Sequence, residues 1–363
     1  MCRSPAIQAG TSPTSGRSTT RSCSIFSTNS VIPAGSAANI GQRERRGPAS
    51  AGLGATGSAG EPDCPSPQDE LVLFDNAPPA LPLPENKRIT LITGDIADGP
   101  IVRRAIAPGT DAVYHLAAVV SGQAEADTDL GYRVNLDGAR AVLEACRALG
   151  TCPRLIFASS LAVYGGRLPP DVGDDTPLRP QTSYGTQKAI GELLVNDFSR
   201  KGFVDGRALR LPTVVVRPGR PNRAASTFAS SIIREPLAGK DAVCPVSPDT
   251  VMALASPRCV AAGLVHALDL PGDAFGDSRS LQLPGFSVAV GDMVEAVRRA
   301  GGEAVHARIR WQPDPLVQQI VSGWPPALAA PRALALGFTA DPGIDAVVYA
   351  FIEDDLEMQK ALV

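Results

Sequence analysis

Tyr184 and Lys188 stand four residues apart in the segment "SYGTQKAIGELL", a spacing that puts both side chains on one face of a helix. A tyrosine, whose ordinary pKa is about 10, exchanges protons near neutrality only if a positive charge stabilises its phenolate. Lys188 is placed to provide that charge. Ser160, which ends the preceding strand-like segment "RLIFASS", can hydrogen-bond and orient a substrate oxygen. These three residues are the candidate catalytic set, with Tyr184 as acid/base. A lone YxxxK spacing also occurs on ordinary helix surfaces, so the spacing by itself does not identify an active site.

Small and polar residues follow the other strand-like segments, where ligands of open α/β sheets bind. Asp75 closes one such segment and can accept hydrogen bonds from ribose hydroxyls. A carboxylate there favours NAD over NADP, because it repels a 2′-phosphate. The small residues after His115 allow a cofactor to approach closely. The candidate cofactor-binding residues are Asp75, Asp95, Ile96, Leu116, Ala117, Ala118, Asn135, Tyr184, Lys188 and Pro212.

Three arginines, Arg217, Arg220 and Arg223, follow the strand-like segment "ALRLPTVVV". Guanidinium groups bind carboxylates through two parallel hydrogen bonds, so we expect at least one of the three to face an acidic substrate. Ser121 lies just past the "HLAA" segment and is expected to line the same pocket. The candidate substrate-binding residues are Ser121, Ser160, Tyr184, Arg217, Asn222 and Arg223.

Alternating strand-like and helix-like segments position these residues. Short apolar runs begin at residues 70, 88, 111, 154 and 208, and amphipathic helix patterns cover 129–150 and 183–202. This alternation predicts an α/β fold, a Rossmann-type doubly wound parallel sheet with a smaller C-terminal substrate domain. We expect the dinucleotide-binding core at 70–211, and at 212–363 a mainly substrate-binding part with returning core strands.

Residues 1–69 differ in composition, being rich in Arg, Ser, Pro and Gly, with Glu44 the one acidic residue among the first sixty. Such a segment buries too little apolar surface to fold, so we expect it to be irregular or disordered. Two explanations are open. An acid-poor, Arg- and Ser-rich start resembles an organellar transit peptide, although no continuous apolar helix face appears in it. A misassigned start or a reading-frame slip explains better why a regular pattern begins abruptly near Glu70.

Two glycine clusters in this segment resemble a dinucleotide-binding turn. Gly52, Gly54 and Gly57 have the G-x-G-x-x-G spacing, but no strand precedes them and prolines follow where a helix should start. In the other cluster, Gly35, Ala38 and Gly41 stand within a shortened strand, turn and helix pattern. The second cluster is the better candidate, and a glycine-rich segment also produces such spacings by chance.

Charge and composition indicate a small-molecule partner. The net charge of −3 and the pI near 5.7 give no electrostatic reason to expect binding to nucleic acid or to an anionic membrane. Seven cysteines without a CxxC pair indicate reduced thiols in the cytoplasm, and no metal site is expected. No apolar run has the length of a membrane span.

The ordered set "ELVLFDN", "TGDIAD", "HLAA", "SSLAVYG" and "YGTQK" resembles the extended short-chain dehydrogenase/reductase family, also called the NAD-dependent epimerase/dehydratase family. The resemblance covers residues 70–340. It implies a Rossmann fold, bound NAD, and a Ser160, Tyr184, Lys188 triad with Tyr184 as acid/base. The family's opening strand and glycine turn are expected to be missing or degraded in this chain.

On the substrate side, the segment "RLPTVVVRPGRPNRAAS" resembles members of the family that oxidise a hydroxyl of a short sugar acid with NAD. Two alternatives stay open at this point. One is a nucleotide-sugar epimerase or dehydratase, in which the arginines would bind a pyrophosphate. The other is an inactive relative that has lost the dinucleotide turn. A homodimer is one assembly left open.

Overall fold

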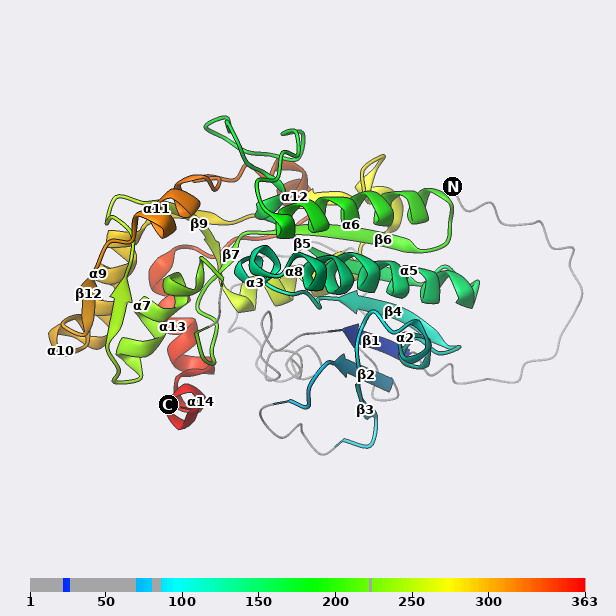
Figure 1. Cartoon of the computed structure of the whole chain (residues 1–363), viewed down its shortest axis with the longest axis horizontal. Helices are drawn as coiled ribbons and strands as arrows, with labels where there is room; N and C mark the ends of the chain where they lie inside the picture. Colours follow the sequence, from blue (N-terminus) through cyan, green and yellow to red (C-terminus); the bar gives the residue numbers. More distant parts are fainter. Residues whose placement is uncertain (1–21, 27–69, 80–85, 222–223, 363) are drawn as a thin grey trace, which may run out of the picture.

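The computed structural model describes residues 22–26, 70–79, 86–221 and 224–362. Its main sheet has seven parallel strands in the order β3-β2-β1-β4-β5-β6-β10. The order reverses between β1 and β4, as in a doubly wound Rossmann sheet, so the predicted fold class is confirmed (Figure 1). The strands are β1 (Ser22–Phe26), β2 (Glu70–Asp75), β3 (Ile89–Thr93), β4 (Thr110–His115), β5 (Arg154–Ser160), β6 (Asp205–Leu211) and β10 (Ser280–Gln282).

Helices cover both faces of this sheet, because successive side chains of each buried strand point to opposite faces. On β5, for example, Phe157 packs against α5 and α6, whereas Ile156 packs on the opposite face with α8 and α12. The first face holds α2 (Gly99–Ala105), α5 (Gly138–Leu149) and α6 (Ser183–Arg200), and the second holds α8 (Pro257–Asp269) and α12 (Pro331–Ala335). Short elements in the connections are α3 (Ser121–Ala126), α4 (Thr128–Gly131), the π-helix η1 (Tyr132–Asp137) and the 3₁₀ turns η2 (Leu161–Val163) and η3 (Gly272–Phe275).

Helix α6 is fixed closely against the sheet. The Thr182 hydroxyl caps its first turn by accepting a hydrogen bond from the backbone N–H of Gly185 at 3.1 Å. Farther along, a Cβ added at Gly191 would stand 2.5 Å from the ring of Phe157, so this glycine permits a close approach of α6 to β5. The helix face that carries Tyr184 and Lys188 is thereby placed over the ends of the central strands.

The C-terminal part of the chain builds a second core. Strands β7 (Thr213–Val214), β9 (Val251–Ala255) and β11 (Phe286–Ala289) form one small sheet, and β8 (Ala242–Cys244) pairs with β12 (Ile309–Trp311). Buried apolar side chains from α7 (Thr227–Leu237), α9 (Val290–Gly301) and α13 (Ile344–Asp354) pack against these strands. The remaining helices are α10 (Glu303–His306), α11 (Pro315–Ser322) and α14 (Leu356–Leu362). The returning strand β10 joins the main sheet beside β6.

From the sequence, the opening strand is expected to be missing or degraded, and for residues 22–26 this expectation is wrong. Strand β1 lies between β2 and β4 and pairs with both in parallel (Figure 1). Its sequence, "SCSIF", shows no clear apolar pattern, because the polar residue Ser24 occupies a fully buried position. The Ser24 hydroxyl is satisfied by donating a hydrogen bond to the Ala105 carbonyl at 2.8 Å. Both glycine clusters lie outside the described residues.

Candidate active site

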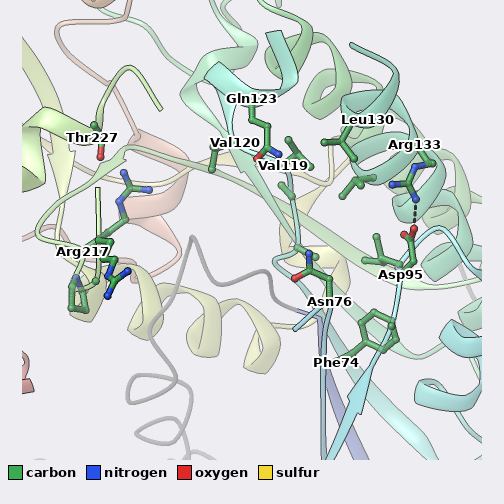
Figure 2. A pocket seen from close by; sticks show the side chains of 18 of the residues that line it. Phe74, Asn76, Asp95, Val119, Val120, Gln123, Leu130, Arg133, Arg217 and Thr227 are labelled. Atoms are coloured by element: carbon green, nitrogen blue, oxygen red, sulfur yellow. Dashed lines mark hydrogen bonds and ion pairs between the residues drawn. The ribbon is translucent and has the colours of Figure 1, made fainter. Parts of the chain in front are cut away.

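A cavity of about 710 Å³ opens at the carboxyl ends of β2, β3 and β4, beside the point where the strand order reverses. This is where open α/β sheets bind ligands. Figure 2 shows Asn76, Asp95 and Arg133 at one end of it and Arg217 and Thr227 at the other, with Val119, Val120 and Gln123 between them. The lining residues are Phe74, Asn76, Gly94, Asp95, Ile96, Ala117, Ala118, Val119, Val120, Gln123, Leu130, Arg133, Val134, Arg217, Pro218, Gly219, Arg220, Thr227 and Arg234.

The structure brings several of the predicted cofactor residues to this cavity. Asp95 and Ile96 line it after β3, and Ala117 and Ala118 line it after β4. The Asp95 carboxylate pairs with the guanidinium of Arg133 and also accepts a hydrogen bond from the backbone N–H of Ala97 at 3.0 Å. Asp75 ends β2 between the cavity residues Phe74 and Asn76, and its carboxylate accepts from the N–H of Ala77 at 3.3 Å.

Other predicted cofactor residues stand behind the cavity wall. Asn135 is buried, and its amide accepts from the N–H of Val119 at 2.7 Å and donates to the Val119 carbonyl at 3.1 Å. The same amide donates to Gln187 on α6 at 2.7 Å, so Asn135 fixes the wall between η1 and α6. Leu116 packs in the core on the opposite face of the sheet, and Pro212 is buried between β6 and β7.

The structure brings Ser160 and Tyr184 together. Burial raises the pKa of Tyr184 to about 12, while a hydrogen bond with Ser160 and the positive charge of Arg217 lower it. The Ser160 hydroxyl also accepts from the N–H of Ala162 at 3.1 Å, which fixes its direction at the end of β5. Arg217 lines the cavity, and its charge lowers the pKa of Tyr184. Tyr184 therefore lies near the arginine end of the cavity.

Lys188 lies on α6 with its Nζ 5.7 Å from the centre of the Tyr184 ring. The ammonium group donates to the carbonyl of Ala158 at 2.7 Å and stands 4.8 Å from the ring centre of Phe157. Burial lowers the pKa of Lys188 to about 7, and the negative charge of Glu192 acts in the opposite direction. Lys188 therefore changes its charge near neutral pH rather than in the alkaline range.

The carboxylate of Glu192 belongs to a buried network that the sequence analysis missed. It accepts from the Ser159 hydroxyl at 2.5 Å and from the Arg210 guanidinium at 2.8 to 3.1 Å, and both charged side chains are almost fully buried. Arg210 also donates to the Tyr164 hydroxyl at 2.8 Å. Spacing offered a signal for Glu192, because it stands four residues after Lys188 on the same helix face. Arg210 gave none, because its partner comes from another element.

One end of the cavity is lined by arginines. Arg217 and Arg220 both line it, together with Arg234 and Thr227 on α7, which the sequence analysis did not select. Burial and the neighbouring charge of Arg234 lower the pKa of Arg217. Ser121 begins α3 beside the lining residue Val120. The remaining candidates, Asn222 and Arg223, lie outside the described residues.

His115, at the end of β4, is buried with neither ring nitrogen hydrogen-bonded within the described structure. Burial, with a smaller effect from the charge of Lys188, lowers its pKa to about 3. The imidazole of His115 is therefore neutral throughout the physiological range.

Among the described residues, no group of three or more His, Cys, Asp or Glu side chains could hold a metal ion. Within the same residues no helix has both the length and the hydropathy of a membrane span. The cavity fits a dinucleotide in position and in lining. It lies at the switch point of the sheet, small residues after β4 allow close approach, and Asn76 and Asp95 offer polar groups at one end.

Comparison with known proteins gives a consistent result. The model of the NAD dependent epimerase/dehydratase family matches residues 53–269. The D-erythronate dehydrogenase of Cupriavidus necator is 58% identical over 270 residues, which is 74% of this chain and 83% of that protein. The D-erythronate dehydrogenase of Haemophilus influenzae is 46% identical over 288 residues, or 79% of this chain and 91% of that protein.

Among solved structures, the nucleoside-diphosphate-sugar epimerase from Agrobacterium tumefaciens matches with a TM-score of 0.81 and 36% identity. That match covers 95% of this chain and 98% of the epimerase chain. The similarity therefore extends over both the main sheet and the C-terminal part.

Proposed function

This chain belongs to the NAD-dependent epimerase/dehydratase family, and we therefore propose that it is an NAD-dependent dehydrogenase that oxidises a hydroxyl of a short sugar acid such as D-erythronate. The observation that carries the proposal is the cavity with a guanidinium end. Arg217, Arg220 and Arg234 line that end, and Arg217 influences the pKa of Tyr184. A carboxylate bound there would hold the rest of a short substrate near Tyr184.

The residues proposed to hold NAD are those at the ends of β2, β3 and β4. Asp75 would accept hydrogen bonds from the adenosine ribose, and Asp95 and Ile96 would lie beside the adenine. Ala117 and Ala118 would allow the nicotinamide half to pass close to the backbone. Bound NAD supplies the acceptor for the hydride that leaves the substrate carbon.

The chain's own residues would bind the substrate and move one proton. Arg217 would bind the carboxylate, and the Ser160 hydroxyl would orient the reacting hydroxyl. Tyr184 would accept the hydroxyl proton as the carbon loses its hydride, so the alcohol becomes a carbonyl and one proton is released in all. Positive charge on Arg217 favours the phenolate form of Tyr184 that this transfer requires, and a protonated Lys188 would add to it.

The test is to incubate the purified chain with NAD and D-erythronate and to follow NADH formation by its absorbance. We expect turnover with D-erythronate and none with the corresponding uncharged polyol, because only the acid offers a carboxylate to Arg217. Absence of turnover together with measurable NAD binding would reject the substrate assignment. Absence of NAD binding would instead favour the inactive relative considered above.

A second candidate is a nucleotide-sugar epimerase, and the similarity to the epimerase from Agrobacterium tumefaciens favours it. The same guanidinium end would then bind a pyrophosphate. Binding of uridine diphosphate, measured by calorimetry, separates the two candidates. We expect it to bind far more weakly than D-erythronate, and the reverse order would favour the epimerase.

We further propose that the protein works in the cytoplasm and forms a homodimer. Among the described residues, Cys146, Cys244 and Cys259 are thiols, which suits a reducing compartment. Leu193 on α6 is 65% exposed, and such an apolar side chain suits contact with a second copy. Light scattering of the purified protein tests the assembly, and a monomer mass would reject it.

A further inference from the structure

The backbone of the loop at residues 217–220 is held by side chains from two other elements. The N–H of Arg217 donates to the hydroxyl of Ser230 at 3.1 Å, and the Arg217 carbonyl accepts from the guanidinium of Arg234 at 2.5 Å. Both partners belong to α7. The N–H of Gly219 donates to the amide oxygen of Gln359 at 2.7 Å. Gln359 belongs to the last helix, α14, 140 residues farther along the chain.

All three partner side chains are buried. Ser230, Arg234 and Gln359 are 1%, 2% and 1% exposed, respectively. Water therefore cannot readily replace any of them, and the loss of one would leave a loop group unsatisfied. Gly219 also has a φ of +103°, a conformation that side-chain-bearing residues rarely adopt. The loop is thus held in one particular backbone conformation.

This conformation matters because all four loop residues line the cavity at its guanidinium end. A guanidinium binds a carboxylate strongly only if the two planar groups meet in the correct orientation. Arg217 has a long and flexible side chain, so its backbone must be fixed for the guanidinium to start from a constant position. The hydrogen bond from Gly219 to Gln359 is the part of this support that comes from outside α7.

We propose that Gln359 is a positioning residue for the substrate, and that α14 is therefore a functional part of the substrate site. Gln359 fixes Gly219, which keeps the Arg217 guanidinium directed at the substrate carboxylate. The proposal rests on the proposed function only for the identity of that substrate. The hydrogen bond itself is independent of it.

The experiment compares Gln359→Met, which keeps the side-chain volume but removes the acceptor, with Gln359→Glu, which keeps an acceptor. Lys360→Ala is the matched control, since Lys360 is the exposed neighbour on the same helix. The first measurement is hydrogen–deuterium exchange of peptides covering 217–221 in the unliganded protein. We expect faster exchange in Gln359→Met, and wild-type exchange in Gln359→Glu and in Lys360→Ala. Unchanged exchange in Gln359→Met overturns the proposal, whatever the substrate is.

The second measurement is steady-state kinetics with D-erythronate and NAD. Gln359→Met should raise the KM for D-erythronate by about ten-fold, since small displacements of a positioning group weaken binding strongly, and leave the KM for NAD unchanged. In an Arg217→Met background the same substitution should have no further effect. An equal further rise there would overturn the proposal, because Gln359 would then act elsewhere.

Two controls separate the possible failures. If wild-type protein does not oxidise D-erythronate, the proposed function fails, and the exchange measurement still decides the role of Gln359. If Gln359→Met does not fold, as judged by thermal unfolding, Gln359→Asn replaces it. Asparagine stays polar, and it is one methylene too short to reach the N–H of Gly219.

Discussion

Burial and charge act on Tyr184 in opposite directions, and their balance decides how readily its hydroxyl releases a proton. Burial raises its pKa to about 12, whereas Ser160 and Arg217 lower it. Burial also brings the pKa of Lys188 down to about 7. A site in which both groups are desolvated depends strongly on every added positive charge, because electrostatic effects are larger away from water.

Replacing Tyr184 by Phe removes the titrating oxygen and keeps the ring. We expect kcat with D-erythronate to fall by at least about 100-fold, the usual contribution of a general acid or base. NAD binding, measured by fluorescence titration, should be unchanged. The control is Tyr349→Phe on α13, where the tyrosine is half exposed and far along the chain. Retained turnover in Tyr184→Phe would contradict the role of Tyr184 as acid/base.

Asp75 allows a test of cofactor preference. Its carboxylate ends β2 beside the cavity and should repel a 2′-phosphate, so the wild type should prefer NAD to NADP. Asp75→Ala should bring the kcat/KM for NAD and the kcat/KM for NADP closer together. Asp111→Ala, near the opposite end of β4, should leave the ratio of the two kcat/KM values as it is. A wild-type preference for NADP would show that Asp75 does not read the ribose.

At the scale of elements, α6 and β1 contribute in different ways. Helix α6 carries Tyr184, Lys188 and Glu192 at intervals of four residues, and its close approach at Gly191 holds that face on the sheet. Strand β1 contributes no cavity-lining side chain among the described residues. Its role is to join β2 to β4, because the strands that carry the two sides of the cavity flank it.

Phe26 tests whether β1 is part of the folded core. It is fully buried, and its ring centre lies 4.9 Å from that of Phe74. Phe26→Ala should lower the free energy of unfolding in urea by about 3–5 kcal/mol, as other large-to-small core substitutions do. Leu316→Ala, at an exposed apolar residue on α11, should change it by less than about 0.5 kcal/mol. Equal effects of the two substitutions would mean that β1 does not hold the sheet together.

At the scale of the whole molecule, the cavity lies where the main sheet meets the C-terminal part. Its lining begins at Phe74 and ends at Arg234, and its arginine loop is held by α14 near the C-terminus. Because polar groups are buried near this cavity, we expect the free energy of unfolding to depend on pH. His115 is the clearest of them, because it is fully enclosed and neutral.

The pKa of His115 is lowered to about 3, whereas an unfolded chain protonates His near 6.5. The unfolded state therefore takes up a proton first as the pH falls. The contribution of His115 to the free energy of unfolding is therefore complete above pH 6.5 and decreases as the pH falls from 6.5 to 3. In the wild type, His115 should lower the free energy of unfolding by about 2 kcal/mol as the pH falls from 6.5 to 5. His115→Leu should not show this part of the loss, as measured by unfolding in urea. An unchanged slope in His115→Leu would reject this explanation.

Local patterns in the sequence determined much of the fold and part of the candidate site. The strand and helix alternation after Glu70 predicted the parallel sheet, since each element shows its period in neighbouring residues. The interval between Tyr184 and Lys188 predicted a shared helix face. Of the residues selected at strand ends, Asp95, Ile96, Ala117, Ala118, Arg217 and Arg220 line the cavity. A parallel sheet gathers its strand ends at one edge, so the order along the chain was enough for these residues.

The tertiary structure alone decided which distant groups meet. Strand β1 was not predicted because five residues with two serines show no period, and only its burial between β2 and β4 makes it a strand. The pairing of Glu192 with Arg210 and the contact of Gly219 with Gln359 join elements far apart in the sequence. Such contacts follow from how the helices and strands pack together, and no spacing along the chain records that packing.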